Sequence, residues 1–282
     1  MKKVLKGGTV VSGEGCKKAD VLVEDGKIGA VAPEITDEEA EVVDVSGKLL
    51  FPGFIDAHTH FDLHVSGTVT ADNFETGTKA ALSGGTTMII DFATQYKGES
   101  LHKALEHWHE KADGNASCDY GFHLAISDWN AEISEELQQI VDEGVTSFKI
   151  YMTYDDMVLD DKSIYQVLKR LKEVGGIAGV HCENKGIIEA LIEEEKAKGH
   201  LTTDAHPKTR PAVVEAEAIS RLLKIADLVH TPVIIVHLSS GAGYQEVKYA
   251  RERGQEVILE TCPQYLVLNE SVYSLPDFEG SK

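Results

Sequence analysis

Two histidines separated by one residue, His58 and His60, close an apolar run that begins at Phe54. Side chains of a β-strand alternate between its two faces, so we expect both imidazoles to point the same way. Neutral imidazoles are common ligands of zinc and of other transition metals. The pair therefore predicts half of a metal site if other strands end in matching ligands. Two surface histidines at a strand terminus are the alternative.

Two further histidines occupy the same kind of position. His181 closes the apolar run 177–181, and His237 closes the run 233–237. The carboxyl ends of parallel strands lie at one edge of a sheet, where the chemistry of a barrel is normally found. Four histidines at the ends of three strands are difficult to explain as core residues. They predict a metal centre.

The other eight histidines are expected to have different roles. His123 opens its predicted strand, which indicates a structural residue, and His64 lies in a loop and remains undecided. The remaining six lie in polar helical or loop stretches and are expected to be solvated. They are His102, His107, His109, His200, His206 and His230.

Lys149 lies inside another apolar strand, 147–151. An unpaired ammonium group is costly to bury, so pairing with a buried acid is one interpretation. The other starts from the amine: desolvation and neighbouring cations lower the pKa of a lysine and favour its neutral form. A neutral amine can be carbamylated, and the anionic carbamate could bridge two dications held by the histidines.

From Leu49 onward, buried-looking strands alternate with amphipathic helices. The predicted strands are 54–58, 87–92, 121–126, 147–151, 177–181, 233–237 and 257–261. Strands that are apolar throughout are buried on both faces, as in parallel sheets. We therefore expect an α/β fold, a (β/α)₈ TIM barrel with seven of its eight strands present. A doubly wound sheet is the alternative, but the first strand here lacks the glycine-rich phosphate turn of that fold.

Amphipathic stripes mark three of the intervening helices. The stripes are Leu101, Ala104, Leu105, Trp108 and Ala112; Ile164, Leu168 and Leu171; and Val214, Ala218, Leu222 and Ile225.

Residues 1–50 have a different pattern, with short β-rich segments separated by glycine-containing turns. The segments are 4–5, 9–11, 20–23, 27–31 and 41–45. Asp25-Gly26 is a strong signal for a two-residue hairpin. We interpret these segments as hairpins of a small antiparallel sheet. The expected organisation is part of a small β-sandwich domain over 1–50, followed by an incomplete barrel domain over 51–282.

Composition excludes several classes of function. The 282 residues carry 27 Lys and Arg against 47 Asp and Glu, a net charge of −20 that repels nucleic acid and anionic membranes. No apolar stretch approaches the roughly 20 residues of a membrane span, and the first residues lack a signal-type apolar core. We expect a cytoplasmic protein. The four cysteines show no Cys-x-x-Cys spacing, which predicts neither a disulfide framework nor a thiolate zinc site.

Five stretches resemble the cyclic amidohydrolases, specifically the dihydropyrimidinase and hydantoinase group. They are Pro52–Asp62, Gly84–Thr87, Ser147–Tyr154, Val180–Asn184 and Cys262–Leu266. The resemblance covers the whole chain. It implies a β-sandwich domain fused to a metal-dependent barrel, usually in a homotetramer.

The resemblance also implies roles for individual residues. His58 and His60 would hold the more buried of two zinc ions, and His181 and His237 the more exposed one. Carbamylated Lys149 would bridge the two ions. Tyr154 would hydrogen-bond the substrate carbonyl oxygen. Manganese or cobalt could replace zinc, because these ligands accept both.

The implied reaction is hydrolysis of the cyclic amide bond of dihydropyrimidines or 5-substituted hydantoins to N-carbamoyl amino acids. A hydroxide that bridges the metals would attack the ring carbonyl carbon. The family supplies the proton of the departing nitrogen from an Asp at the end of strand eight, and this sequence stops at Lys282, before that region. We therefore expect the 282-residue chain alone to be inactive.

Single positions separate the relatives of this group. Dihydroorotases carry an Arg where this chain has Asp62, and mononuclear deaminases carry a Glu where it has Asn184. A non-catalytic scaffold of the same fold and another cyclic amidohydrolase, such as an allantoinase, remain as alternatives. The stretches 63–66 and 154–158 are expected to shape the substrate pocket.

Overall fold

Seven parallel strands form the centre of the computed structural model, which describes residues 1–65 and 67–281. The strands are β8 (Phe54–Thr59), β11 (Thr86–Thr94), β12 (Asp119–Ala125), β13 (Ser147–Tyr151), β14 (Ile177–His181), β15 (Val233–Ile235) and β16 (Val257–Leu259). Their order in the sheet is β16-β15-β14-β13-β12-β11-β8, so each of these strands lies next to the one that follows it along the chain. All seven predicted strands are present. The expected barrel-type α/β fold is confirmed as a curled, open seven-stranded sheet.

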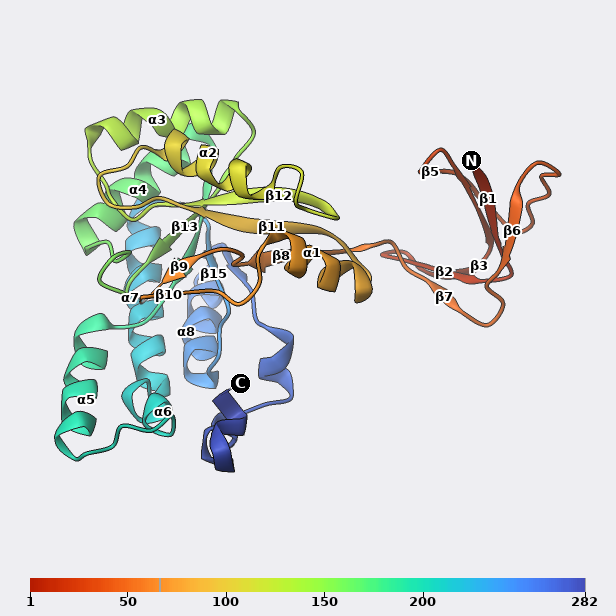
Figure 1. Ribbon diagram of the computed structural model, residues 1–282. Coiled ribbons are helices and arrows are strands. Elements are labelled where there is room, and N and C mark those ends of the chain that lie inside the picture. Colours follow the sequence, from red (N-terminus) through yellow and green to blue (C-terminus); the bar gives the residue numbers. More distant parts are fainter. Residues whose placement is uncertain (66, 282) are drawn as a thin grey trace.

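Helices connect these strands and lie around the outside of the sheet (Figure 1). They are α1 (Phe74–Ser83), α2 (Leu101–Ala112), α3 (Ala131–Asp142), α4 (Asp161–Val174), α5 (Lys185–Ala197), α6 (Ala205–Thr209), α7 (Ala212–Val229) and α8 (Gly241–Glu252). A two-stranded ribbon, β9 (His64–Val65) and β10 (Thr68–Val69), precedes α1. Three 3₁₀ turns, η1 (Pro263–Leu266), η2 (Glu270–Ser274) and η3 (Pro276–Ser281), follow β16. In the described ranges, no helix combines the length and the apolar character that crossing a membrane requires.

The predicted apolar stripes form the contact between helices and sheet. Every residue of the stripes on α2 and α4 is buried, and on α7 only Ile225 remains partly exposed. Helices start where side chains accept backbone N–H groups: Ser100 caps α2, Asp160 caps α4 and Ser240 caps α8. The buried stripes hold the helices against the sheet, and the caps determine where each helix begins.

The N-terminal strands form two sheets, which fits the expected part of a β-sandwich, but two of their strand pairs are parallel where the turn signals predicted antiparallel pairing. One has the order β5-β4-β1-β6 and the other β3-β2-β7. Their strands are β1 (Lys2–Lys6), β2 (Thr9–Ser12), β3 (Gly15–Lys18), β4 (Asp20–Glu24), β5 (Lys27–Ala32), β6 (Glu41–Asp44) and β7 (Leu49–Leu50). The pairs β1–β6 and β2–β7 are parallel, because β6 and β7 return after long connections that local turn signals do not describe.

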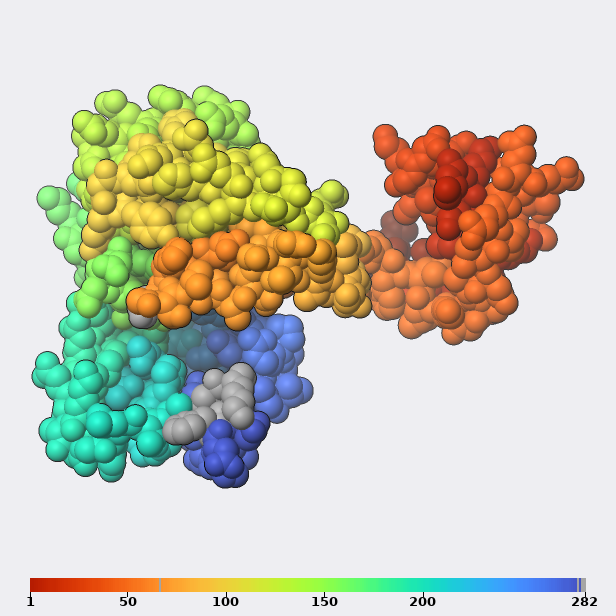
Figure 2. Space-filling model, in the orientation of Figure 1, coloured from red at the N-terminus to blue at the C-terminus, as the bar shows by residue number. Residues whose placement is uncertain are grey.

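The Asp25-Gly26 hairpin is confirmed. Both residues have positive φ, 49° and 76°, as a type I′ turn between β4 and β5 requires. Figure 2 shows the N-terminal segment as a lobe set apart from the barrel sheet and its helices. We propose that the boundary between the two domains lies near residue 50.

Candidate metal centre

Four imidazoles from three strands gather at the carboxyl edge of the sheet. The ring centroids of His58 and His60 are 5.2 Å apart, those of His58 and His237 5.3 Å, and those of His181 and His237 4.7 Å. The parallel register of β14 and β15 brings His181 and His237 together, although 56 residues separate them in sequence. The structure thus places all four predicted ligands in one cluster.

His237 does not close its strand as predicted. β15 ends at Ile235, and His237 lies two residues further on with a left-handed backbone, φ 37°. Its amide donates to the Glu260 carboxylate at 3.0 Å instead of continuing the strand ladder. A left-handed conformation is uncommon for a residue other than glycine, and such strained residues are enriched at functional sites.

Carboxylates accept hydrogen bonds from two of the four imidazoles. Nδ1 of His58 lies 2.7 Å from Glu260 Oε2, and Nε2 of His181 lies 2.9 Å from Glu183 Oε2. An ionised carboxylate only accepts, so these ring nitrogens carry the hydrogen. The opposite nitrogens are His58 Nε2 and His181 Nδ1, and the second of these lies 3.0 Å from Nε2 of His237. Metal-ligating histidines usually have such a carboxylate partner.

Burial keeps three of the four imidazoles neutral. Desolvation lowers the pKa of His60 to about 3 and that of His237 to about 2, and it also lowers the pKa of His181. Nδ1 of His60 is buried without a hydrogen-bond partner, and Nδ1 of His181 lies 3.0 Å from Nε2 of His237. Neutral imidazoles with unused nitrogens are the donors that a transition metal requires.

Within residues 1–65 and 67–281, no group of three or more His, Cys, Asp or Glu side chains already has the geometry needed to hold a metal ion. The His181–His237 contact takes up nitrogens that a metal would use. The fit to a metal therefore rests on the donor set: four imidazoles, two of them oriented by carboxylates, and one ring nitrogen buried without a partner.

Lys149 completes the cluster from β13. Its side chain is fully buried, and Nζ has no hydrogen-bond partner in the described part of the chain. The ammonium lies 4.7 Å from the ring centroid of Phe92 and 5.1 Å from that of Tyr151. Desolvation lowers its pKa to about 7, although the charge of Glu260 opposes the shift. The interpretation that Lys149 pairs with a buried acid is therefore not met.

The sequence analysis missed three carboxylates at this edge. Glu260 follows β16 and Glu183 lies two residues after His181, so their position at strand ends was a usable signal. The third, Asp91, is buried within β11. It accepts from Thr59 Oγ1 at 2.8 Å and from the Phe61 amide at 2.9 Å.

Asp91 therefore fixes the residues on either side of His60. The register between β8 and β11 shifts next to Asp91. The other carboxylate oxygen of Asp91 accepts from the indole N–H of Trp108 at 3.0 Å. Desolvation raises the pKa of Asp91 to about 6. We interpret Asp91 as a structural group that sets the direction of His60.

His123 is engaged through both ring nitrogens. Nδ1 lies 2.5 Å from Ser147 Oγ and Nε2 lies 3.0 Å from the carbonyl oxygen of Ala57. The residue lies inside β12 and not at its start, because this strand begins at Asp119. These contacts support the structural role expected for it. Of the six histidines predicted to be solvated, four are exposed, whereas His102 and His107 are half-buried.

A cleft of about 540 Å³ adjoins the cluster through Tyr154, which lines the cleft and contacts His181. Both stretches predicted to shape the pocket line it: His64 and Val65 from β9, and 154–157 after β13; Ser66 lies outside the described residues. The ring of Tyr154 is 5.1 Å from that of His181, and desolvation raises the pKa of its hydroxyl. The hydroxyl is thus a protonated hydrogen-bond donor at neutral pH.

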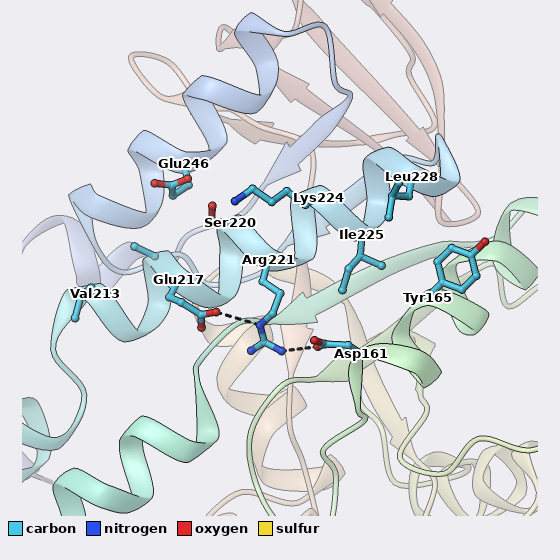
Figure 3. Close-up of a pocket in the computed structure, with 11 residues that line it drawn as sticks. Asp161, Tyr165, Val213, Glu217, Ser220, Arg221, Lys224, Ile225, Leu228 and Glu246 are labelled. Atoms are coloured by element: carbon cyan, nitrogen blue, oxygen red, sulfur yellow. Dashed lines mark hydrogen bonds and ion pairs between the residues drawn. The ribbon is translucent and has the colours of Figure 1, made fainter.

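A second hollow, of about 650 Å³, lies between the outer faces of α4 and α7 (Figure 3). Three of its charged groups pair with one another, because Arg221 contacts both Asp161 and Glu217. The four clustered histidines line neither hollow, but Tyr154, which lines the smaller cleft, has its ring 5.1 Å from that of His181. We therefore assign the chemistry to the smaller cleft.

Comparisons with known proteins identify the family of the chain. The model of the amidohydrolase family matches residues 49–264. A D-hydantoinase of Geobacillus stearothermophilus is 44% identical over 284 residues, which cover 100% of this chain and 60% of the relative. A dihydropyrimidinase of Rattus norvegicus is 40% identical over 261 residues, 90% of this chain and 50% of the relative.

Solved structures show the same similarity. The crystal structure of dihydropyrimidinase from Brevibacillus agri NCHU1002 matches with a TM-score of 0.97 and 45% identity, covering 100% of this chain and 62% of that one. The L-hydantoinase of Arthrobacter aurescens matches with a TM-score of 0.83 and 27% identity, covering 96% and 60%. The chain spans about three fifths of the length of the first of the curated relatives.

Proposed function

Because this chain belongs to the amidohydrolase family, we propose that the protein hydrolyses the cyclic amide bond of dihydropyrimidines or 5-substituted hydantoins and releases N-carbamoyl amino acids. Hydantoinases of this family are generally metal-dependent. The observation that carries the proposal is the cluster of four imidazoles, three of them kept neutral by burial, next to the buried, unpartnered amine of Lys149.

We propose that His58 and His60 hold one zinc ion, that His181 and His237 hold a second, and that carbamylated Lys149 bridges them. Manganese or cobalt would be accepted by the same donors. When bound, such ions would lower the pKa of a water molecule and polarise the substrate carbonyl. The anionic carbamate would offset part of the metal charge, which neutral imidazoles leave uncompensated.

The residues of the chain would orient the substrate. Tyr154 would donate its hydroxyl hydrogen to the carbonyl oxygen of the ring as negative charge develops on it. The hydroxyl keeps its hydrogen at neutral pH because burial raises its pKa. The neighbouring cleft would hold the ring and its substituent out of bulk water.

Ring opening by the full-length, metal-loaded protein is the direct test. We expect loss of ultraviolet absorbance for at least one compound in a panel of dihydrouracil, dihydrothymine and 5-substituted hydantoins. Metal-free protein is the control, and activity should return when zinc is added back. Allantoin in the same panel tests an allantoinase activity. Metal-loaded protein that opens none of these rings contradicts the proposal and favours a scaffold.

The Tyr154→Phe variant should lower kcat by about 10²- to 10³-fold, the effect of removing one donor to a developing oxyanion. Its metal content should stay unchanged, because the hydroxyl is not among the proposed ligands. Tyr165→Phe, on the outer face of α4, is the matched control and should behave as the parent protein. A normal kcat for Tyr154→Phe would assign the oxyanion contact to another group.

We also propose a homotetrameric, cytoplasmic protein. The resemblance to the dihydropyrimidinase and hydantoinase group supports the tetramer, and light scattering of the full-length protein tests it.

A further inference from the structure

We propose that Glu260 is a positioning residue that couples the two proposed metal sites, because one of its carboxylate oxygens holds a ligand of each. Oε2 receives Nδ1–H of His58 at 2.7 Å and the backbone N–H of His237 at 3.0 Å. His58 belongs to the first proposed site and His237 to the second. The inference rests on the proposed metal centre and adds to it the residue that links its two halves.

The backbone fixes the position of Glu260. Its amide donates to the carbonyl of Ile235 at 2.9 Å, and its own carbonyl accepts from the amide of Leu238 at 2.9 Å. These two bonds extend the pairing of β16 with β15 beyond the regular strands and enclose His237. The carboxylate is therefore held by the sheet, and its half-buried oxygen has little freedom to follow a displaced ligand.

The two bonds act on the ligands in different ways. The bond to His58 determines the tautomer, since Nδ1 must carry the hydrogen and Nε2 is then free for a metal. The bond to His237 supplies a partner for an amide that the left-handed backbone, φ 37°, turns away from the strand ladder. Loss of Glu260 would free the tautomer of His58 and remove a support for the strained backbone of His237.

Glu183 provides an internal comparison. Its Oε2 receives Nε2–H of His181 at 2.9 Å, and its Oε1 lies 3.6 Å from Nε of Arg210. Unlike Glu260, it contacts a ligand of only the second proposed site. Replacing Glu260 is therefore expected to affect both metal sites, whereas replacing Glu183 is expected to affect only the second.

The test uses the full-length protein and measures zinc per chain by mass spectrometry while the free zinc concentration is buffered over a wide range. We expect Glu260→Gln to weaken both sites by about 10- to 100-fold, the usual effect of removing an outer partner of a metal ligand. Glu183→Gln should weaken one site only and leave the affinity of the other unchanged. Absorption of bound Co²⁺ should report the same two patterns without any assay of activity.

Glu260→Asp is the second variant, to be used if Glu260→Gln does not fold. It keeps the negative charge but moves the carboxylate away from His58 and His237. It should weaken both metal sites, by a smaller factor than Glu260→Gln. Thermal melting of the metal-free variants checks folding. Loss of a single site in the Glu260 variants, or affinities equal to those of the parent, would overturn the coupling while the metal centre stands. A parent protein that binds no metal would overturn the proposed function together with this inference.

Discussion

Replacement of Lys149 by alanine should abolish binding of two metal ions and lower turnover of the full-length protein by more than about 10³-fold, because bound metal contributes several kcal/mol of transition-state stabilisation. Lys149, on β13, is fully buried, its Nζ has no partner in the described residues, and its charge acts on His60, His181 and His237. Without a carbamate, two dications would face each other across neutral ligands. Metal analysis and a hydantoin assay measure the two effects.

Short carboxylates distinguish a bridging role from a packing role. Acetate or propionate should restore part of the metal content and activity of Lys149→Ala, because they can occupy the space and the charge of the lost bridge. Lys149→Arg is the control and should not recover, since a guanidinium group does not form a carbamate. If Lys149→Ala bound two zinc ions per chain and turned over normally, the bridging role of Lys149 would be wrong.

The pH dependence follows from the pKa of Lys149, which desolvation lowers from 10.5 to about 7. Below pH 7 the amine is protonated and cannot react with carbon dioxide, so carbamate formation should increase as the pH rises through 7. The unfolded chain still binds this proton up to about pH 10. The contribution of Lys149 to the stability of the metal-free protein should therefore increase with pH between these values. Carbon-13 NMR with labelled bicarbonate detects the carbamate.

Residues 1–282 expressed alone should aggregate or remain partly molten, with little or no hydrolytic activity. Strands β8 and β16 each pair on one side only in the described sheet, which leaves two open edges. Apolar side chains are exposed on both, including Ile55 at 61% and Ile258 at 44%. The resemblance also places an acid-base Asp on an eighth strand, and such a group contributes about 10²- to 10⁴-fold in rate.

Size-exclusion chromatography, thermal melting and a hydantoin assay measure the outcome. Ile258→Lys is a useful variant, because a charge on an edge strand should reduce association without restoring activity. A segment that supplies the eighth strand, added in trans, should restore part of the activity. A monodisperse, cooperatively melting and fully active 282-residue chain would show that these edges need no further cover.

The sequence by itself determined the barrel strands and the four-histidine cluster. Local patterns were sufficient, because apolar runs bounded by turn residues specify strands and parallel strands place their carboxyl ends together. Lys149 was recognisable for the same reason, since an ammonium inside an apolar strand conflicts with burial. The Asp25-Gly26 hairpin depended only on the conformations open to two adjacent residues.

Only the tertiary structure decided which groups orient those ligands. His58 and Glu260 are 202 residues apart, and no local pattern predicts that one carboxylate oxygen would also receive the amide of His237. The parallel pairs of the N-terminal sheets were missed for a related reason, because they join segments that distant connections bring together. Hydrogen bonds between remote residues depend on how whole elements pack, whereas the pattern of buried side chains depends on each segment alone.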